Sequence, residues 1–155
     1  MLQTGKTGML YVLDRETGVP VYPVEERPVP ASTVSGEEAW PTQPFTTVFP
    51  PLSPHRFSLD QVWGPTPADL ASCREQVGKL RNEGIFTPPS LEGTLVLPSN
   101  IGGAHWGGLA VDPGRQLAIV PVNRIIAEVQ LIPREEYRRR RNEPGYRLEG
   151  SQYTS

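Results

Sequence analysis

Proline and glycine punctuate the whole chain and limit the folds that are open to it. The 155 residues include 18 prolines and 15 glycines, which interrupt every long periodic pattern. Because proline lacks an amide donor and glycine readily adopts turn conformations, helix bundles and coiled coils fit this sequence poorly. Short strands separated by frequent turns fit it well, and we expect an all-β or β-rich fold.

The charge balance and the single cysteine exclude several classes of function. Fifteen basic residues against 17 acidic ones give a formal net charge of -2, so no nucleic acid partner is expected. Cys73 alone cannot form an intramolecular disulfide or a cysteine cluster, and no metal site is predicted within the chain. Residues 1–5 have neither the basic nor the apolar part of a signal peptide, and no segment is apolar for long enough to cross a membrane.

The first 24 residues predict a β-hairpin. Residues 9–14 are strand formers, the turn Asp14-Arg15-Glu16-Thr17-Gly18 follows, and residues 19–24 are extended again. In such a turn the Asp14 carboxylate can cap backbone amides, and Gly18 can take a positive φ. Because a lone hairpin is marginal in water, we expect its outer neighbours to come from elsewhere in a longer chain or from a partner.

Residues 25–90 predict a proline-rich insertion that contains one helix. Its prolines remove backbone donors and leave little for a sheet ladder, so we expect a surface excursion, with disorder as the alternative. Four aromatic side chains should anchor it on a scaffold: Trp40, Phe45, Phe49 and Phe57. A helix is predicted over about 67–83, with Thr66 as N-cap, Pro67 at the first position and Gly84 as the stop. One helix face carries Leu70, Cys73, Val77 and Leu80, which makes Cys73 a small buried hydrophobe rather than a nucleophile.

The second half of the chain predicts a β-meander of the kind found in a propeller blade. Its strands are expected at 94–97, 108–112, 116–122 and 125–132. Pro133 then opens a short charged helix over 134–141. Its arginines alternate with glutamates, which favours a solvated helix face over a phosphate or lipid-headgroup site.

An ordered set of unusual sequence strings resembles a known family, the quinoprotein alcohol and sugar dehydrogenases, which carry pyrroloquinoline quinone on a β-propeller. Asp14, Thr17 and Gly18 resemble the blade-closing motif Ala-x-Asp-x-x-Thr-Gly-x-x-x-Trp, with Tyr22 in place of the tryptophan. Further matching strings follow in the family order, at 26–30, 41–45, 84–90, 93–98, 106–113 and 131–134. Within the family the likeness is to the membrane-bound glucose dehydrogenase type. It implies that residues 1–155 are a fragment of the propeller domain.

The resemblance implies three cofactor-binding residues, Lys6, His105 and Trp106. Lys6 matches the family lysine that contacts the adjacent quinone oxygens, where a cation stabilises negative charge; without that context Lys6 is a solvated surface charge. Residues 102–108 resemble a Gly-Gly-Ala-Asn-Trp-Gly-Gly string that lines the cofactor cavity, with His105 replacing the asparagine. The alternatives are a structural histidine at 105 and a blade-core tryptophan at 106. Asn123 is a weak substitute for another family asparagine.

No catalytic residue is predicted in the chain, so whether it is itself an enzyme stays open. The family's general-base aspartate precedes the lysine, and its calcium or magnesium ligands also lie outside this stretch. His55 has no paired carboxylate in sequence and is expected at the surface.

The parent protein is expected to oxidise glucose or another sugar or alcohol and to pass electrons to ubiquinone on the periplasmic side of the bacterial inner membrane. The rest of the propeller would be the partner of this chain. Two alternatives are a non-catalytic propeller fragment or interaction module with a decayed cofactor site, and an independent proline-rich interaction domain.

Overall fold

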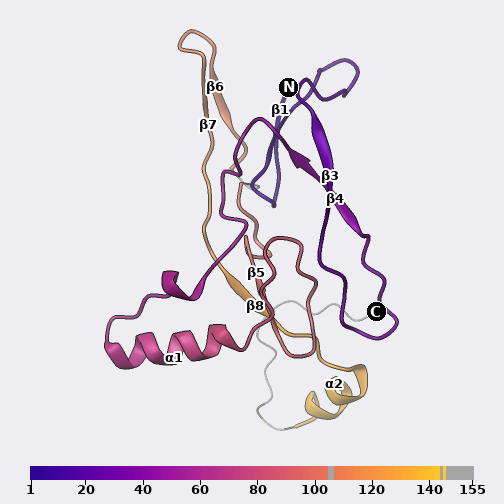
Figure 1. Ribbon diagram of the computed structural model, residues 1–155, viewed down its shortest axis with the longest axis vertical. Helices are drawn as coiled ribbons and strands as arrows, with labels where there is room; N and C mark the ends of the chain where they lie inside the picture. Colours follow the sequence, from indigo (N-terminus) through magenta and orange to yellow (C-terminus); the bar gives the residue numbers. More distant parts are fainter. Residues whose placement is uncertain (105–106, 144, 146–155) are drawn as a thin grey trace.

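The computed structural model describes residues 1–104, 107–143 and 145. Their elements are β1 (Leu2–Thr4), β2 (Leu10–Val12), β3 (Val24–Pro28), β4 (Thr42–Thr46), a 3-10 turn (Leu59–Gln61), α1 (Pro67–Gly78), β5 (Thr94–Val96), β6 (Ala110–Asp112), β7 (Leu117–Ile119), β8 (Ala127–Val129) and α2 (Arg134–Arg140). The strands form four separate two-stranded antiparallel sheets joined by long irregular segments (Figure 1). The β-rich prediction is therefore confirmed, but no sheet within these ranges reaches the size of a complete propeller blade.

The N-terminal strand pairing differs from the predicted hairpin. β2 pairs with β1, in the register Leu2↔Val12, so one neighbour of β2 comes from the first residues of the chain itself. The predicted return arm is present only in part: Leu13 forms an isolated bridge with Pro20, the Asp14 amide donates to the Val19 carbonyl, and the Val21 amide donates to the Val12 carbonyl, both at 2.8 Å. Pro20 and Pro23 lack amide donors, which limits this arm to a short pairing.

The turn between these arms has the predicted geometry. Asp14 Oδ1 accepts hydrogen bonds from the amides of Glu16 and Thr17, at 3.0 and 2.8 Å, and from Thr17 Oγ1 at 2.8 Å. Gly18 has a φ of 75°. The hydrogen bonds to the carboxylate hold the pKa of Asp14 below its ordinary value of 3.8, with the Thr17 amide as the largest cause.

The proline-rich segment does form a ladder, contrary to the sequence-based expectation. β3 pairs with β4 over five residues, with Pro28 opposite Thr42 and Pro44 opposite Glu26. The amide of Val29 donates to the Pro41 carbonyl at 3.0 Å. Because hydrogen-bonded and non-hydrogen-bonded pairs alternate in an antiparallel ladder, Pro28 and Pro44 fall on non-hydrogen-bonded pairs. The missing donors of these two prolines therefore cost the ladder nothing.

Aromatic side chains anchor the insertion only in part. Phe45 contacts Phe86 edge-to-face with ring centroids 5.7 Å apart, and Phe49 contacts Tyr22 in the same way at 5.5 Å. Phe57 is half-buried. Trp40 is 73% exposed, so it does not anchor the insertion on the described part of this chain.

Helix α1 begins where the sequence predicts and ends earlier. The Thr66 hydroxyl accepts from the Asp69 amide at 3.2 Å, and Pro67 occupies the first turn. The predicted apolar stripe, which includes Cys73, is half-buried while the rest of the helix is exposed. The helix stops at Gly78 instead of about residue 83, because the backbone of Arg81 pairs with residues 93–95 instead of continuing the helix. The Arg81 amide donates to the Gly93 carbonyl, and the Arg81 carbonyl accepts from the Leu95 amide, both at 3.0 Å.

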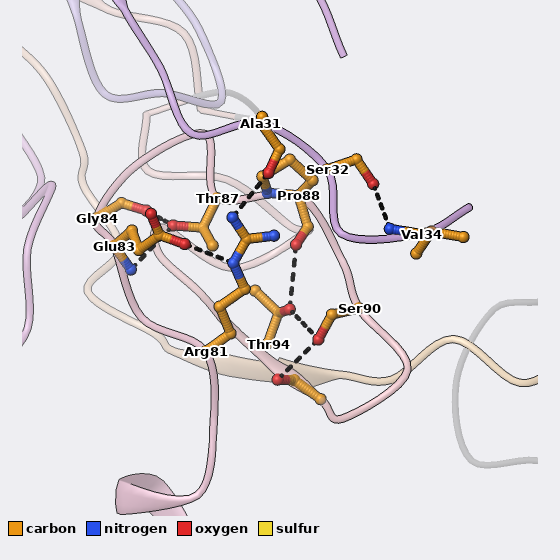
Figure 2. A network of polar contacts seen from close by, with 11 residues as sticks. Ala31, Ser32, Val34, Arg81, Glu83, Gly84, Thr87, Pro88, Ser90 and Thr94 are labelled. Atoms are coloured by element: carbon orange, nitrogen blue, oxygen red, sulfur yellow. Dashed lines mark hydrogen bonds and ion pairs between the residues drawn. The ribbon is translucent and has the colours of Figure 1, made fainter. Parts of the chain in front are cut away.

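Polar contacts around Arg81 join the insertion to β5 (Figure 2). Arg81 Nη2 donates to the Ala31 carbonyl at 2.7 Å, and Nε forms an ion pair with Glu83 at 2.5 Å. Beside it, Thr94 Oγ1 donates to the Pro88 carbonyl at 3.1 Å and also contacts Ser90 Oγ. Hydroxyl groups thus fill part of the interior that apolar side chains would fill in a larger core.

The C-terminal strands are nested and do not form the predicted meander. β5 pairs with β8, while β6 and β7, which lie between them in sequence, pair with each other. In Figure 1 the β6–β7 ribbon extends away from the other sheets. Its side chains include Val111, Leu117 and Ile119, all exposed.

Helix α2 carries the predicted charged face. Glu136 bridges Arg139 and Arg140 at 2.6 Å each, which lowers the pKa of the Glu136 carboxyl to about 2. Pro133 is the N-cap rather than the first helical residue. In the ranges that the structure describes, neither α-helix has the length and apolar character needed to cross a bilayer.

Candidate functional site

Lys6 lies on the tight turn that connects β1 to β2. The amide of Gly8 donates to the Gly5 carbonyl at 2.9 Å, and Gly8 has a φ of 71°. The Lys6 side chain is exposed, and its ammonium group donates to the Asn100 carbonyl at 2.9 Å. An ammonium group has three hydrogens to donate, so this contact leaves donors for a ligand.

The glycine pair of the predicted cofactor segment packs directly on this turn. The Gly103 amide donates to the Lys6 carbonyl at 2.7 Å, and Thr4 Oγ1 donates to the Ala104 carbonyl at 2.9 Å. A Cβ atom added to Gly102 would lie 2.7 Å from Lys6 Cγ, so only glycine allows this approach. Residues far apart in the sequence, 4–8 and 102–104, thereby form one site.

Two of the three predicted cofactor residues, His105 and Trp106, lie outside the described residues. Their contact with a cofactor stays a prediction, as does that of Lys6. Asn123 takes part through its backbone: its amide donates to the Gly103 carbonyl at 2.6 Å. Its neighbour Pro121 would lie 2.5 Å from a Cβ atom added to Gly107, so the 121–123 segment borders the same loop.

The sequence predicted His55 at the surface, but the side chain is half-buried beside the Lys6 turn. Its Nε2 atom is 2.7 Å from the Thr7 carbonyl, and since a carbonyl only accepts, Nε2 carries the hydrogen. The ring also contacts Phe45 edge-to-face, at 6.3 Å. Burial lowers the pKa of His55, so the imidazole is neutral at neutral pH.

A shallow depression of about 190 Å³ opens beside Lys6. Thr7, Phe86 and Ser99 also line it. Phe86 has a φ of 65°, in the left-handed region that bulky residues rarely adopt. The buried Ser99 hydroxyl has no hydrogen-bond partner among the described residues.

No group of three or more histidine, cysteine or acidic side chains within the described ranges is arranged to hold a metal ion. The charged member of the site is thus Lys6, and its other members are backbone carbonyls, small side chains and the neutral His55. Such an arrangement can donate hydrogen bonds to an oxygen-rich ligand and stabilise negative charge on it.

Sequence reasoning missed Ser53, which is 1% exposed and lies at the centre of the site. Its hydroxyl donates to the Asn123 carbonyl at 2.9 Å. A serine between prolines carries no periodic signal, so only its contacts identify it. Those contacts are with glycines 8 and 103, on the two turns already described.

Comparisons with known proteins agree on one family. Residues 1–154 match the family described as glucose/ethanol/alcohol dehydrogenase, β-propeller domain. The chain is 45% identical over 130 residues to the quinoprotein glucose dehydrogenase of Escherichia coli K12, and 43% identical over 130 residues to that of Gluconobacter oxydans 621H. It is 35% identical over 127 residues to the quinate/shikimate dehydrogenase (quinone) of Acinetobacter baylyi.

These alignments cover 83%, 83% and 82% of this chain, but only 16% of each relative. The chain therefore spans about one sixth of the length of the curated relatives it matches. No solved structure gives a significant match.

Proposed function

The chain belongs to the glucose/ethanol/alcohol dehydrogenase β-propeller family, and from that premise we propose that it is part of a quinoprotein dehydrogenase that oxidises glucose or another sugar or alcohol. In this proposal the chain supplies partial propeller blades, and Lys6 contacts pyrroloquinoline quinone. One observation carries the proposal: the Lys6 turn is seated on the Gly102–Gly103 turn, so the two segments that the resemblance assigns to the cofactor meet in space.

The residues present fit one edge of the cofactor. The Lys6 ammonium keeps free donors after its bond to Asn100, and the buried Ser99 hydroxyl nearby has no partner among the described residues. The chemistry that pyrroloquinoline quinone supplies when bound is the two-electron oxidation of an alcohol. Lys6 would hold a positive charge at the quinone oxygens, where reduction increases negative charge. His105 would hydrogen-bond the cofactor, and Trp106 would pack against it.

The remaining parts of the reaction belong to the rest of the propeller in this proposal. No acidic residue lines the depression beside Lys6 among the described residues, so in this proposal the general base is not supplied by this site. An aspartate and a calcium or magnesium ion would come from other blades. Electrons would pass to ubiquinone, and the protein would act on the periplasmic side of the bacterial inner membrane.

Titration of the chain with pyrroloquinoline quinone, followed by amide NMR shifts, tests the role of Lys6. We expect shifts at Gly8, Gly102 and Gly103 that Lys6→Gln abolishes, because the variant loses the cation but keeps the turn. Lys79→Gln is the matched control, since Lys79 is an exposed lysine at the C-cap of α1, where it pairs with Glu75. Shifts that persist in the Lys6 variant would contradict the proposal.

A second candidate function is a non-catalytic propeller fragment or interaction module. It is favoured by the lack of an acidic residue lining the depression beside Lys6 in the described part of the chain, and by the close approach of Pro121 to Gly107. A wild-type chain whose spectrum does not respond to the quinone would support it. We expect no dye reduction by the purified chain with glucose, the quinone and calcium; measurable reduction would contradict our assignment of the base to other blades.

A further inference from the structure

The segment 52–55 of the proline-rich insertion lies directly against the Lys6 turn. The Leu52 amide donates to the Gly8 carbonyl at 2.8 Å. A Cβ atom added to Gly8 would be 2.8 Å from Ser53 Cβ, and one added to Gly103 would be 2.4 Å from Ser53 Oγ. Ser53 is therefore wedged between the two turns that form the candidate site.

A chain of hydrogen bonds leads from Ser53 to the backbone of Lys6. Ser53 Oγ donates to the Asn123 carbonyl at 2.9 Å, and the Asn123 amide donates to Gly103 at 2.6 Å. The Gly103 amide then donates to the Lys6 carbonyl at 2.7 Å. Loss of the Ser53 hydroxyl would leave the buried end of this chain without its donor.

His55 holds the other side of the same turn. Its Nε2 hydrogen binds the carbonyl of Thr7, the residue after Lys6, while the Ile85 amide fixes the His55 carbonyl at 2.8 Å. Pro51 and Pro54 flank this segment and restrict its backbone. The insertion thus reaches the Lys6 turn through a stiff peptide with two directed polar contacts.

We propose that Ser53 and His55 are positioning residues for Lys6, which hold its turn against the Gly102–Gly103 turn so that the ammonium group faces its ligand. This inference rests on the proposed function for the role of Lys6. In this inference the proline-rich insertion supports the cofactor site from outside, and Ser53 and His55 act through the Lys6 turn rather than by contacting the cofactor. Protonation of His55 does not release the turn, because the imidazolium also donates from Nε2.

Amide hydrogen exchange tests the inference without the cofactor. His55→Leu removes the donor to Thr7 and should raise exchange at Gly8 and Gly103 about tenfold, the effect of losing one buried hydrogen bond. His55→Gln can donate from its side-chain amide and should restore most of the protection. Ser53→Ala should raise exchange at Gly103, whereas Ser72→Ala, on the exposed face of α1, should not.

Exchange at Val29, whose amide donates to Pro41 just beyond the end of the β3–β4 ladder, reports whether each variant is folded. Unchanged exchange at Gly8 and Gly103 in folded His55→Leu and Ser53→Ala chains would overturn the inference. So would protection that His55→Gln fails to restore.

The same variants are then titrated with pyrroloquinoline quinone. His55→Leu should bind about tenfold more weakly than His55→Gln, because the Lys6 ammonium is no longer held in place. Equal affinities despite altered exchange would also overturn the inference. A wild-type chain without any response to the quinone contradicts the proposed function instead, and the exchange rates still decide whether Ser53 and His55 hold the turn.

Discussion

At the scale of single residues, Ser53 is closely packed on two sides. Glycines 8 and 103 approach it from two different turns, and a Cβ atom on either would come within 2.8 Å of Ser53. Side chains this close leave no room for even one added methyl group. The Lys6 turn and the 102–104 turn can therefore pack together only because residues 8, 53 and 103 are small.

We expect Gly103→Ala to lower the free energy of unfolding by about 1–3 kcal/mol, the usual cost of overpacking a filled interior. Its methyl group would meet Ser53 Oγ at 2.4 Å. Gly5→Ala is the matched control, because a Cβ atom there meets nothing within 4 Å. Urea denaturation of both variants measures the difference, and equal stabilities would contradict the packing described.

Asp14 should titrate below 3.8, since its carboxylate accepts hydrogen bonds from Glu16 and Thr17. Because the folded pKa is lowered, the stabilisation from this turn is fully present above 3.8 and is lost as the pH falls through the lowered pKa. A carbon NMR titration of the Asp14 carboxyl group measures the midpoint. In Asp14→Asn the acceptor remains but the charge does not, so this contribution to acid sensitivity should vanish; a midpoint at or above 3.8 would contradict it.

At the scale of elements, the sequence predicts features that depend on neighbouring residues, but not those that depend on backbone pairing between distant segments. The start of α1 follows from Thr66 and Pro67, which act on their immediate neighbours. Its end does not, because Gly93 and Leu95 bind the backbone of Arg81 across the fold. Similarly, the prolines of β3 and β4 looked incompatible with a ladder until the register placed them on non-hydrogen-bonded pairs.

The candidate site divides in the same way. Lys6 and the Gly102–Gly103 pair could be named because family-specific strings surround them. Ser53 and His55 could not, because they touch the Lys6 turn from about fifty residues away and carry no motif. His55 was assigned to the surface since a proline-rich segment usually stays there, whereas here the segment folds back over the turn.

Thr66→Ala should lower the stability of α1 by about 1 kcal/mol, because the Asp69 amide loses its acceptor at the helix start. Ser72→Ala is the control on the same helix, at an exposed interior position where alanine favours the helix. Circular dichroism at 222 nm during urea unfolding compares the two. A Thr66 variant as helical and as stable as the Ser72 variant would contradict the capping role.

At the scale of the whole molecule, the described sheets are too small to bury both faces. Isolated two-stranded sheets are marginal in water, and the β6–β7 ribbon exposes Val111, Leu117 and Ile119. Because the chain covers about one sixth of its relatives, other blades are the natural cover for this ribbon in the proposed parent protein.

Ile119→Lys tests this view. Ile119 is 63% exposed, so the variant should unfold at the same urea concentration as the wild type while binding less of a hydrophobic dye and associating less with itself. Leu95→Ala is the contrasting variant: Leu95 is 2% exposed, and its truncation should cost about 2–5 kcal/mol. A large loss of stability in Ile119→Lys would place this side chain in the interior instead.

The nesting of β6–β7 between β5 and β8 also predicts an order of folding. Residues 97–126 must close into a loop before β5 can meet β8, and the entropic penalty of closure grows with the length of free chain. If the β6–β7 hairpin forms first, beginning at its turn at 113–116, fewer residues of free chain remain between β5 and β8. Gln116 has a φ of 54° in this tip, so Gln116→Gly should accelerate refolding in stopped-flow experiments while leaving the unfolding rate almost unchanged.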